Sequence, residues 1–170
     1  MLYDLTVKQF SKMLTNLSLI LVKSQEHFDN KGLEVQTLLD SQLAPDQFNL
    51  TRQIQVVCDT AKLAVARLVG QLDSAPKHED NQASMQALLA RIKEVKDYIE
   101  TFSEDDFKEA NERKLRHKYW GDKHLTGYDF ALQYATPNMY FHVSMAYAIL
   151  RHNGVDVGKM DYLGKLPFKD

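Results

Sequence analysis

Two polar side chains on an otherwise apolar stretch of sequence are the first candidates for chemistry. Asn138 and His142 are four residues apart, so on a helix both project from one face, separated by about 40°. A buried imidazole beside a buried amide is either a set of ligands or a hydrogen-bonded pair within the core. Buried polar groups usually satisfy one another, which favours the core pair and leaves the ligand set as the alternative.

A second pair, Gln55 and Asp59, shows the same four-residue spacing in another segment. It lies on the side away from the main apolar stripe of that segment. A buried aspartate requires a cation, a metal or several hydrogen-bond donors. The alternative is a surface carboxylate that lies near Arg52 and Lys62.

The remaining reactive and aromatic side chains have ordinary structural explanations. Cys58, the single cysteine, lies in an apolar segment and is expected to be a small buried hydrophobe rather than a nucleophile. It cannot form an intramolecular disulfide, which is typical of a reducing compartment. Six aromatic residues either line a pocket or pack a long connection: Tyr119, Trp120, Tyr128, Tyr134, Tyr140 and Tyr147.

Motifs and composition argue against several classes of function. The sequence has no P-loop, dinucleotide-binding glycine fingerprint, nucleophile elbow, His-Glu-x-x-His or paired zinc cysteines. Its 21 basic and 23 acidic residues are spread along the chain, which disfavours nucleic acid and a membrane surface as partners. There is no signal-peptide pattern and no apolar run of roughly 20 residues. We therefore expect a cytoplasmic protein.

The periodicity of apolar residues predicts an all-α fold, a four-helix bundle formed by a single domain of residues 1–170. The predicted helices span about 6–31, 49–72, 80–102 and 136–151. The fourth is apolar nearly all round and is expected to be the most buried. The second is apolar on more than its main stripe, which favours a homodimer, because twofold symmetry is the commonest way to bury such a surface.

Side chains at the predicted helix ends support these limits. Thr6 has capping-box spacing at the first helix, Asn49 is placed to cap the second, and Thr136 is placed to cap the fourth. Pro137 then fits the first helical position, where its missing N–H costs nothing. Gly154 is placed to take the left-handed conformation after the last turn.

The connections are expected to contain structure of their own. A short helix is expected near residues 33–39, and the connection 103–135 is too long for a simple turn. Ser103 is placed to cap a short helix there, and residues 115–119 and 124–128 are expected to pair as a small hairpin. The C-terminal tail is expected to wrap over the bundle.

Several runs of sequence resemble a known family. Residues 137–142 (Pro-Asn-Met-Tyr-Phe-His), 146–154 and 58–64 resemble an uncharacterised family of bacterial and fungal proteins. That family is similar to the DinB/YfiT-like superfamily, four-helix bundles that include metal-dependent thiol transferases and a thiol-dependent isomerase. The resemblance covers most of the chain and implies the same fold.

The resemblance also implies a metal site. Members of the superfamily bind a divalent metal through one histidine on the second helix and a His-x-x-x-His pair on the fourth. The pair falls on Asn138 and His142, and Gln55 or Asp59 is the nearest substitute for the missing histidine of the second helix. The implied ligands are therefore His142, Asn138 and Asp59, with zinc or nickel as the ion. An amide is a poor ligand for either metal.

Two classes of function follow. In the first, a metal on His142, Asp59 and Asn138 activates a thiol or water, as in a metal-dependent thiol transferase or hydrolase. In the second class, a non-catalytic bundle binds a small molecule or dimerises through a helix face, and hydrogen bonds among these side chains take the place of the implied metal. One imidazole, one amide and one carboxylate are weaker than three strong donors, so the sequence favours a degenerate metal or ligand site around His142.

Overall fold

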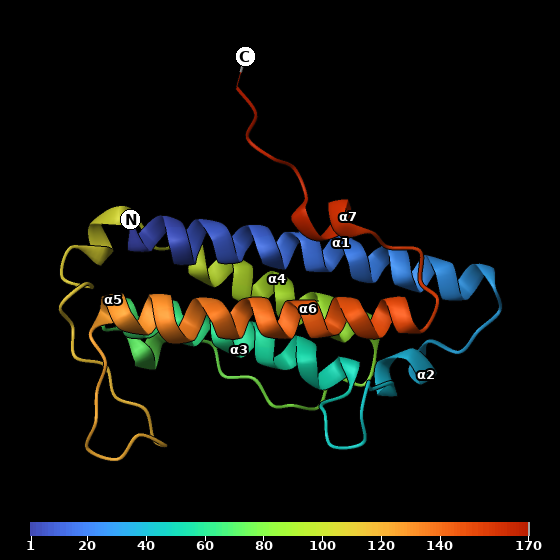
Figure 1. Cartoon of the computed structure of the whole chain (residues 1–170), viewed down its shortest axis with the longest axis horizontal. Helices are drawn as coiled ribbons and strands as arrows, with labels where there is room; N and C mark the ends of the chain where they lie inside the picture. Colours follow the sequence, from blue (N-terminus) through green and yellow to red (C-terminus); the bar gives the residue numbers. More distant parts are fainter. Residues whose placement is uncertain (170) are drawn as a thin grey trace.

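Four long helices form the predicted all-α bundle in the computed structural model, which describes residues 1–169 (Figure 1). They are α1 (Gln9–Asn30), α3 (Leu50–Val69), α4 (Met85–Ile99) and α6 (Thr136–His152). Helix α3 packs against both α4 and α6, and α1 packs against α4 and, over a shorter stretch, α6. The bundle therefore places α3 and α6, which carry the candidate residues, side by side.

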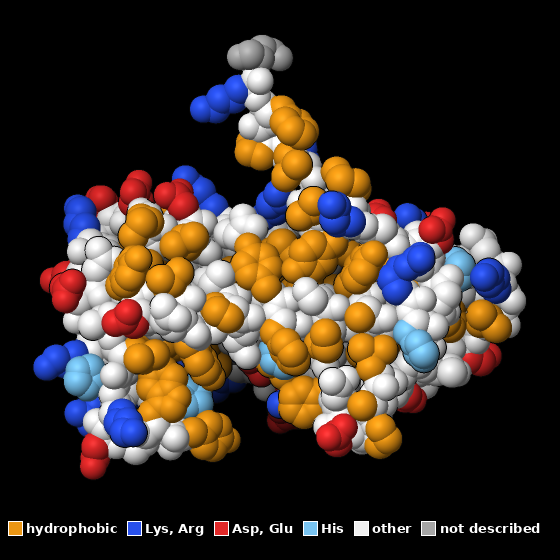
Figure 2. Space-filling view, viewed as in Figure 1, with side chains coloured by type: hydrophobic (Ala, Val, Ile, Leu, Met, Phe, Trp, Pro, Cys, Tyr) orange, Lys and Arg blue, Asp and Glu red, His pale blue; other side chains and the backbone are white. Residues whose placement is uncertain are grey.

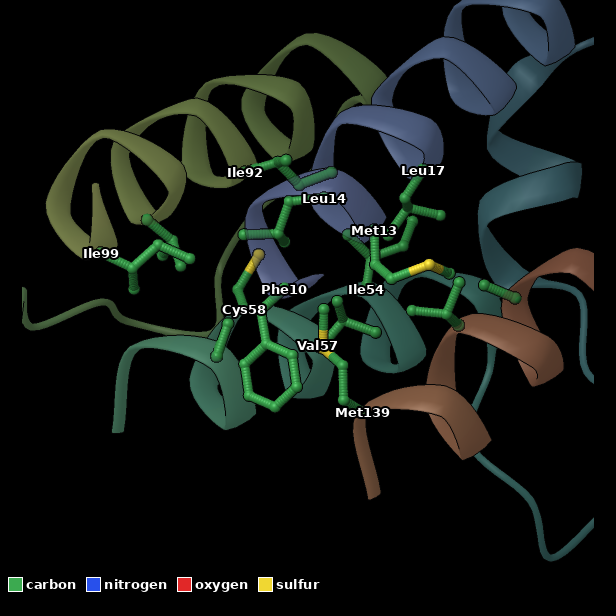
Figure 3. Close-up of a cluster of buried hydrophobic side chains, with 14 of the residues drawn as sticks. Phe10, Met13, Leu14, Leu17, Ile54, Val57, Cys58, Ile92, Ile99 and Met139 are labelled. Atoms are coloured by element: carbon green, nitrogen blue, oxygen red, sulfur yellow. The ribbon is translucent and has the colours of Figure 1, made fainter. Parts of the chain in front are cut away.

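A continuous apolar cluster fills the space between the four helices. Phe10 and Leu14 of α1 meet Val57 of α3, Ile92 of α4 and Met139 of α6 in this cluster (Figure 3). Each of these five side chains is at most 1% exposed. Burial of apolar surface on this scale is the main source of stability for such a bundle.

The first helix begins earlier than its sequence predicts. A π-helical turn, η1 (Asp4–Lys8), precedes α1, and the Thr6 hydroxyl donates to the Leu2 carbonyl at 2.8 Å. The predicted capping box at Thr6 is therefore wrong, because Thr6 already lies inside the helical run. The physical reason is that Leu2 and Val7 are buried and extend the apolar stripe toward the N-terminus.

The second helix begins as predicted and ends slightly earlier. The Asn49 side chain accepts a hydrogen bond from the Arg52 N–H, which confirms it as the N-cap of α3. Gly70, at φ 75°, ends the helix in the left-handed conformation that glycine adopts readily. Leu72 therefore lies outside α3, in the short turn η2 (Leu72–Ser74). The third helix starts at Met85 rather than near residue 80, with Ser84 as its cap.

The fourth helical run begins well before Thr136. It is continuous through α5 (Gly127–Asp129), the π-helical η4 (Phe130–Ala135) and α6. Thr126 is its cap and accepts from the Asp129 N–H at 3.1 Å, so the predicted cap at Thr136 is wrong. A proline inside a helix lacks an N–H and crowds the preceding turn, and the widened turn of η4 accommodates Pro137. Gly154, at φ 79°, follows the last turn as predicted.

Helix α3, rather than α6, is the most buried of the four. Buried positions surround α3, whereas those of α6 are limited to one side. Phe141 of α6 is 53% exposed, and Met145 is only partly buried. The expectation of a fully enclosed fourth helix is wrong, because α3 has α4 and α6 on different sides while α6 has one extensive helical neighbour.

Most of the predicted structure in the connections is present. The short helix α2 (Val35–Asp40) lies where it was expected, and Ser103 caps η3 (Glu104–Phe107). The predicted hairpin is reduced to one antiparallel bridge between Leu115 and Leu125, because the chain enters α5 soon afterwards.

The C-terminal tail crosses α1. It forms α7 (Lys159–Leu163), where the Asn16 side chain donates to the Tyr162 carbonyl at 2.9 Å, and residues 165–169 extend away from the bundle (Figure 1). Over residues 1–169, no helix has both the length and the apolar character needed to cross a membrane.

Candidate ligand site between α3 and α6

His142 is a buried imidazole that is hydrogen-bonded to the neighbouring helix. Its Nδ1 lies 2.7 Å from Oε1 of Gln53 on the first turn of α3, and the side chain is 8% exposed. The Gln53 amide is oriented by its own NH₂, which donates to the Phe48 carbonyl at 3.2 Å. Because an amide oxygen only accepts, Nδ1 of His142 donates, and Nε2 of the neutral ring is the unprotonated nitrogen.

The surroundings of His142 favour its neutral form. Burial lowers the pKa of its imidazole, and the positive charge of Arg52 lowers it further. The Phe48 ring stacks on the imidazole at a centroid distance of 6.4 Å, and Phe141 meets it edge-on at 5.1 Å. A small cavity of about 180 Å³ adjoins these rings. His142 is thus a packed, hydrogen-bonded residue at the edge of a narrow space.

Asn138 also bonds across to α3 rather than to His142. Its NH₂ donates to the Thr60 hydroxyl at 2.8 Å. The prediction of a hydrogen-bonded core pair therefore needs correction, because each of the two residues has its own partner on α3. Helices α3 and α6 run in opposite directions, so the residue nearer the start of α6 meets the residue further along α3.

Asp59 is satisfied by two basic side chains. Its Oδ1 lies 2.8 Å from the Arg91 guanidinium and 2.9 Å from the Lys62 ammonium. Those side chains are 1% and 4% exposed, so they supply the cations that a partly buried carboxylate needs. The predicted neighbour Lys62 is confirmed, whereas Arg52 pairs with Asp80 instead.

The same basic residues hold the segment between α3 and α4 in place. Arg91 also bonds to Asp80 and to Gln82, each at 2.8 Å, and Lys62 Nζ lies 2.7 Å from Nδ1 of His78. Gln55, the other member of the predicted pair, donates to Gln82 at 3.0 Å. This network explains why a largely buried helix carries Asp59, Lys62 and Gln55.

The single thiol is inert. Cys58 is fully buried, and burial raises its pKa to about 12. At that pKa the reactive thiolate is essentially absent near neutral pH, so the expectation of a small buried hydrophobe is confirmed.

The three residues that the resemblance implied as metal ligands are not brought together. His142 lies at the 180 Å³ cavity, whereas Asn138 and Asp59 line a different and larger one. Within residues 1–169, no three His, Cys, Asp or Glu side chains are arranged to hold a metal ion. With His142 bonded to Gln53 and Asp59 to two cations, this donor set does not fit a three-ligand metal centre. Metal binding by these residues stays a prediction.

The larger cavity, of about 300 Å³, lies between α3 and the run from η4 to α6. Residues 117–119 of the preceding connection complete it. Its walls combine basic, apolar and aromatic side chains: Arg52, Val56, Asp59, Thr60, Leu63, Ala64, Arg67, His117, Lys118, Tyr119, Phe130, Tyr134, Ala135 and Asn138. A volume of this size accommodates a small molecule.

Positive charge dominates this cavity. Arg67 takes part in none of the ion pairs found among the described residues, and its guanidinium makes one long contact of 3.4 Å with the Leu63 carbonyl. Burial lowers its pKa. The pKa of the neighbouring His117 is lowered by burial and then by the charges of Arg67 and Lys118. Asp59, the one acid in the described lining, is already neutralised by Arg91 and Lys62.

Sequence reasoning missed Gln53, Thr60 and Arg67 on α3. The first two are the partners of His142 and Asn138, and the third is the half-buried cation of the cavity. A signal for them exists, because the three are spaced by seven residues and therefore share one helix face. A polar residue repeated at this interval on a largely apolar helix indicates a polar seam with a neighbouring helix.

The fold and the polar seam between the second and fourth long helices define an all-α four-helix-bundle protein. The chain belongs to the family described as a domain of unknown function, DUF1993, whose model matches residues 2–163. A crystal structure of a protein from Shewanella denitrificans, described as a DinB family member, shares 54% sequence identity with it. That alignment covers 100% of this chain and 96% of the other, with a TM-score of 0.97. No curated protein matches the chain.

Proposed function

We propose that this protein binds a small organic anion in the cavity between α3 and α6. The observation that carries the proposal is Arg67, a half-buried guanidinium that lines the cavity and takes part in none of the ion pairs of residues 1–169, while the nearby Asp59 is paired with Arg91 and Lys62. Removing a guanidinium from water is costly unless an anion pairs with it. A bound carboxylate or phosphate would supply that anion and the bidentate hydrogen bonds that arginine favours.

The rest of the lining suits the body of such a ligand. Phe130 and Tyr134 offer ring surfaces, and Leu63 and Ala64 offer aliphatic surface. Mostly apolar walls with a few placed polar groups are the usual composition of a small-molecule site. The ligand would therefore combine one anionic group with an apolar portion.

A binding role is favoured over the metal-dependent transferase or hydrolase that the family resemblance implied. A metal enzyme requires several strong donors around one open coordination position. Here His142 bonds to Gln53, and Asp59 bonds to Arg91 and Lys62. In this proposal, the degenerate site around His142 is a hydrogen-bonded support that holds α6 against α3 beside the ligand cavity.

The test compares benzoate with its neutral isostere benzamide by isothermal titration calorimetry. We expect wild-type protein to prefer benzoate, and Arg67→Gln to reduce that affinity roughly 10- to 100-fold, the effect of losing a charge-assisted hydrogen-bonded pair. Lys93→Gln, at an exposed position on α4, is the charge-matched control and should bind like wild type. Equal affinity for benzoate and benzamide, or an Arg67→Gln variant that binds like wild type, would contradict the proposal.

A further inference from the structure

A second cavity adjoins the first and shares two of its walls. It has a volume of about 500 Å³ and is bounded by residues 119, 120 and 123–125 together with 133 and 134. Tyr119 and Tyr134 line both cavities, so the two spaces are neighbours. Figure 2 shows hydrophobic side chains gathered over this connection, at the lower left of the molecule.

Three aromatic residues line the second cavity: Tyr119, Trp120 and Tyr134. Trp120 meets Tyr134 edge-on, with centroids 5.3 Å apart and planes at 89°. Trp120 also contacts the His117 ring at 5.3 Å and the Phe130 ring at 6.4 Å. These contacts orient the indole, which is itself only partly buried and remains part of the cavity wall.

The loop that carries these rings is fixed at its base. Leu115 and Leu125 exchange two backbone hydrogen bonds, of 2.8 and 3.0 Å, and close the loop between them. Gly121, at φ 58°, allows the tight turn next to Trp120. The base of the loop is therefore fixed by the backbone, and Trp120 and Tyr134 also pack against the hydrophobic core.

Tyr119 is an exposed aromatic residue whose ring lies 5.2 Å from the His117 ring, with the Lys118 ammonium 4.7 Å from its centroid. Its side chain is 77% exposed, so it contributes little to the core, although it lines both cavities. Although Lys118 lies over this ring, most of the ring stays exposed, and it offers surface on which a flat ring can stack. Arg67 and Lys118, which line the adjoining cavity, provide positive charge next to this aromatic surface.

From this juxtaposition we infer that the ligand is an aromatic carboxylate, with its carboxylate at Arg67 and its ring against Tyr119 and Trp120. The inference rests on the proposed function and adds the chemical class of the ligand. An extended aliphatic acid would gain binding affinity from burial alone, whereas a flat aromatic ring would also gain affinity from stacking. The site should therefore distinguish an aromatic ring from a saturated ring with the same number of carbon atoms.

The experiment compares 3-phenylpropionate with 3-cyclohexylpropionate by calorimetry, and follows the emission of Trp120, the single tryptophan, in parallel. We expect wild type to bind the aromatic acid roughly three- to tenfold more tightly, the range of an aromatic pair interaction, and its binding to change the Trp120 emission. Tyr119→Ala should remove that preference while retaining affinity for the saturated acid. Tyr128→Ala, a partly exposed tyrosine outside both linings, is the matched control.

The outcomes separate this inference from the proposal on which it rests. Equal, Arg67-dependent binding of both acids would overturn the aromatic preference and leave the anion site intact. A preference that persists in Tyr119→Ala, or is lost equally in Tyr128→Ala, would overturn the assignment of the ring to this wall. If wild type binds neither acid, both the anion site and the aromatic subsite are wrong.

Discussion

The hydrogen bond between His142 and Gln53 accounts for a buried imidazole without a metal. Both side chains are buried, at 8% and 3% exposure, and each satisfies a polar atom of the other. Removal of one partner leaves a buried acceptor or donor without a partner, which costs about 1–3 kcal/mol. His142, which the resemblance implied as a metal ligand, therefore joins α6 to α3 through Gln53.

This role predicts how substitution at position 142 affects stability. We expect His142→Ala to lower the melting temperature by a similar margin with and without added zinc or nickel, because Oε1 of Gln53 is left unsatisfied in each case. The measurement is thermal unfolding of wild type and variant under both conditions, with His152→Ala, an exposed histidine on the same helix, as control. Stabilisation by metal that appears in wild type and disappears only in His142→Ala would instead establish a working metal site.

At the scale of elements, the start of the fourth helical run depends on a close backbone contact. A Cβ added to Gly127 would lie 1.8 Å from the Ala110 carbonyl oxygen, which cannot move without shifting the connection between α4 and α5. We expect Gly127→Ala to lower the free energy of unfolding by about 1–3 kcal/mol or more, the range of overpacking. Urea unfolding measures this change.

Gly158→Ala is the control for that substitution. A Cβ at Gly158 would meet nothing closer than 3.8 Å, and its backbone is extended at φ −126°. The control should therefore be close to neutral. A Gly127→Ala variant as stable as the control would show that the contact between Gly127 and Ala110 is not as close as described.

The long helices could be predicted because apolar stripes of helical period and local end signals lie in the sequence itself. Asn49 and Gly154 act through their own backbone surroundings, so their roles could be recognised locally. Thr136 was wrongly predicted as a helix cap, because a threonine followed by a proline can also lie directly after a π-helical turn. The actual cap is Thr126. It precedes the three-residue helix α5, which is too short to show the apolar periodicity from which a helix start is predicted.

The candidate site was predicted only in part, for a related reason. Helical spacing identified Asn138 and His142 as polar positions of one face, but it could not supply their partners on α3. Partners across a helix interface depend on the direction and offset of the two helices, which a single sequence does not state. The cavity at Arg67 is a space between elements, so it too appears only when they are assembled.

At the scale of the whole molecule, a homodimer stays a prediction. The spare apolar surface of the second long helix, which favoured it, is covered within the chain by α4 and α6. A dimer would have to use other apolar side chains, such as Phe48 and Phe141, which are 49% and 53% exposed and adjoin the same small cavity.

Sedimentation velocity over a wide concentration range tests this prediction. We expect a concentration-dependent dimer that Phe141→Ser weakens. Leu33→Ser, at another half-exposed apolar position, should leave it unchanged. A monomer at every concentration would remove the expectation.

The free energy of unfolding of the whole molecule should also decrease as the pH falls. Burial lowers the pKa of His142 and of His117 from the usual value of 6.5. Between the lowered pKa of the native state and the usual pKa of the unfolded chain, the unfolded chain therefore binds more protons than the native state. Stability therefore rises with pH across this interval. The contribution of each histidine to the free energy of unfolding is complete above about pH 6.5, and it decreases as the pH falls toward the pKa of that histidine in the native state.

A separate loss is expected at lower pH. The pKa of Asp80 is lowered by its hydrogen bond to Arg91 and by Arg52, against the opposing effect of burial, and the pKa of Glu100 is lowered by its bond to Ser11. Each carboxylate stabilises the native state at pH values above its usual pKa, which is 3.8 for Asp80 and 4.5 for Glu100. This stabilisation is lost as the pH falls through the lowered pKa of the native state. Urea unfolding at pH 7.5, 6.0 and 5.0 therefore isolates the histidine step from that of the carboxylates.

Within that range, the wild type should lose stability on acidification, and His142→Gln should lose less because it has one titrating imidazole fewer. His152→Gln, at an exposed position, should follow the wild type. If His142→Gln and wild type lost stability equally between pH 7.5 and 5.0, protonation of His142 would not be linked to unfolding. The imidazole would then have to accept a proton in the native state as readily as in the unfolded chain, which conflicts with its burial beside Arg52 and its bond to Gln53.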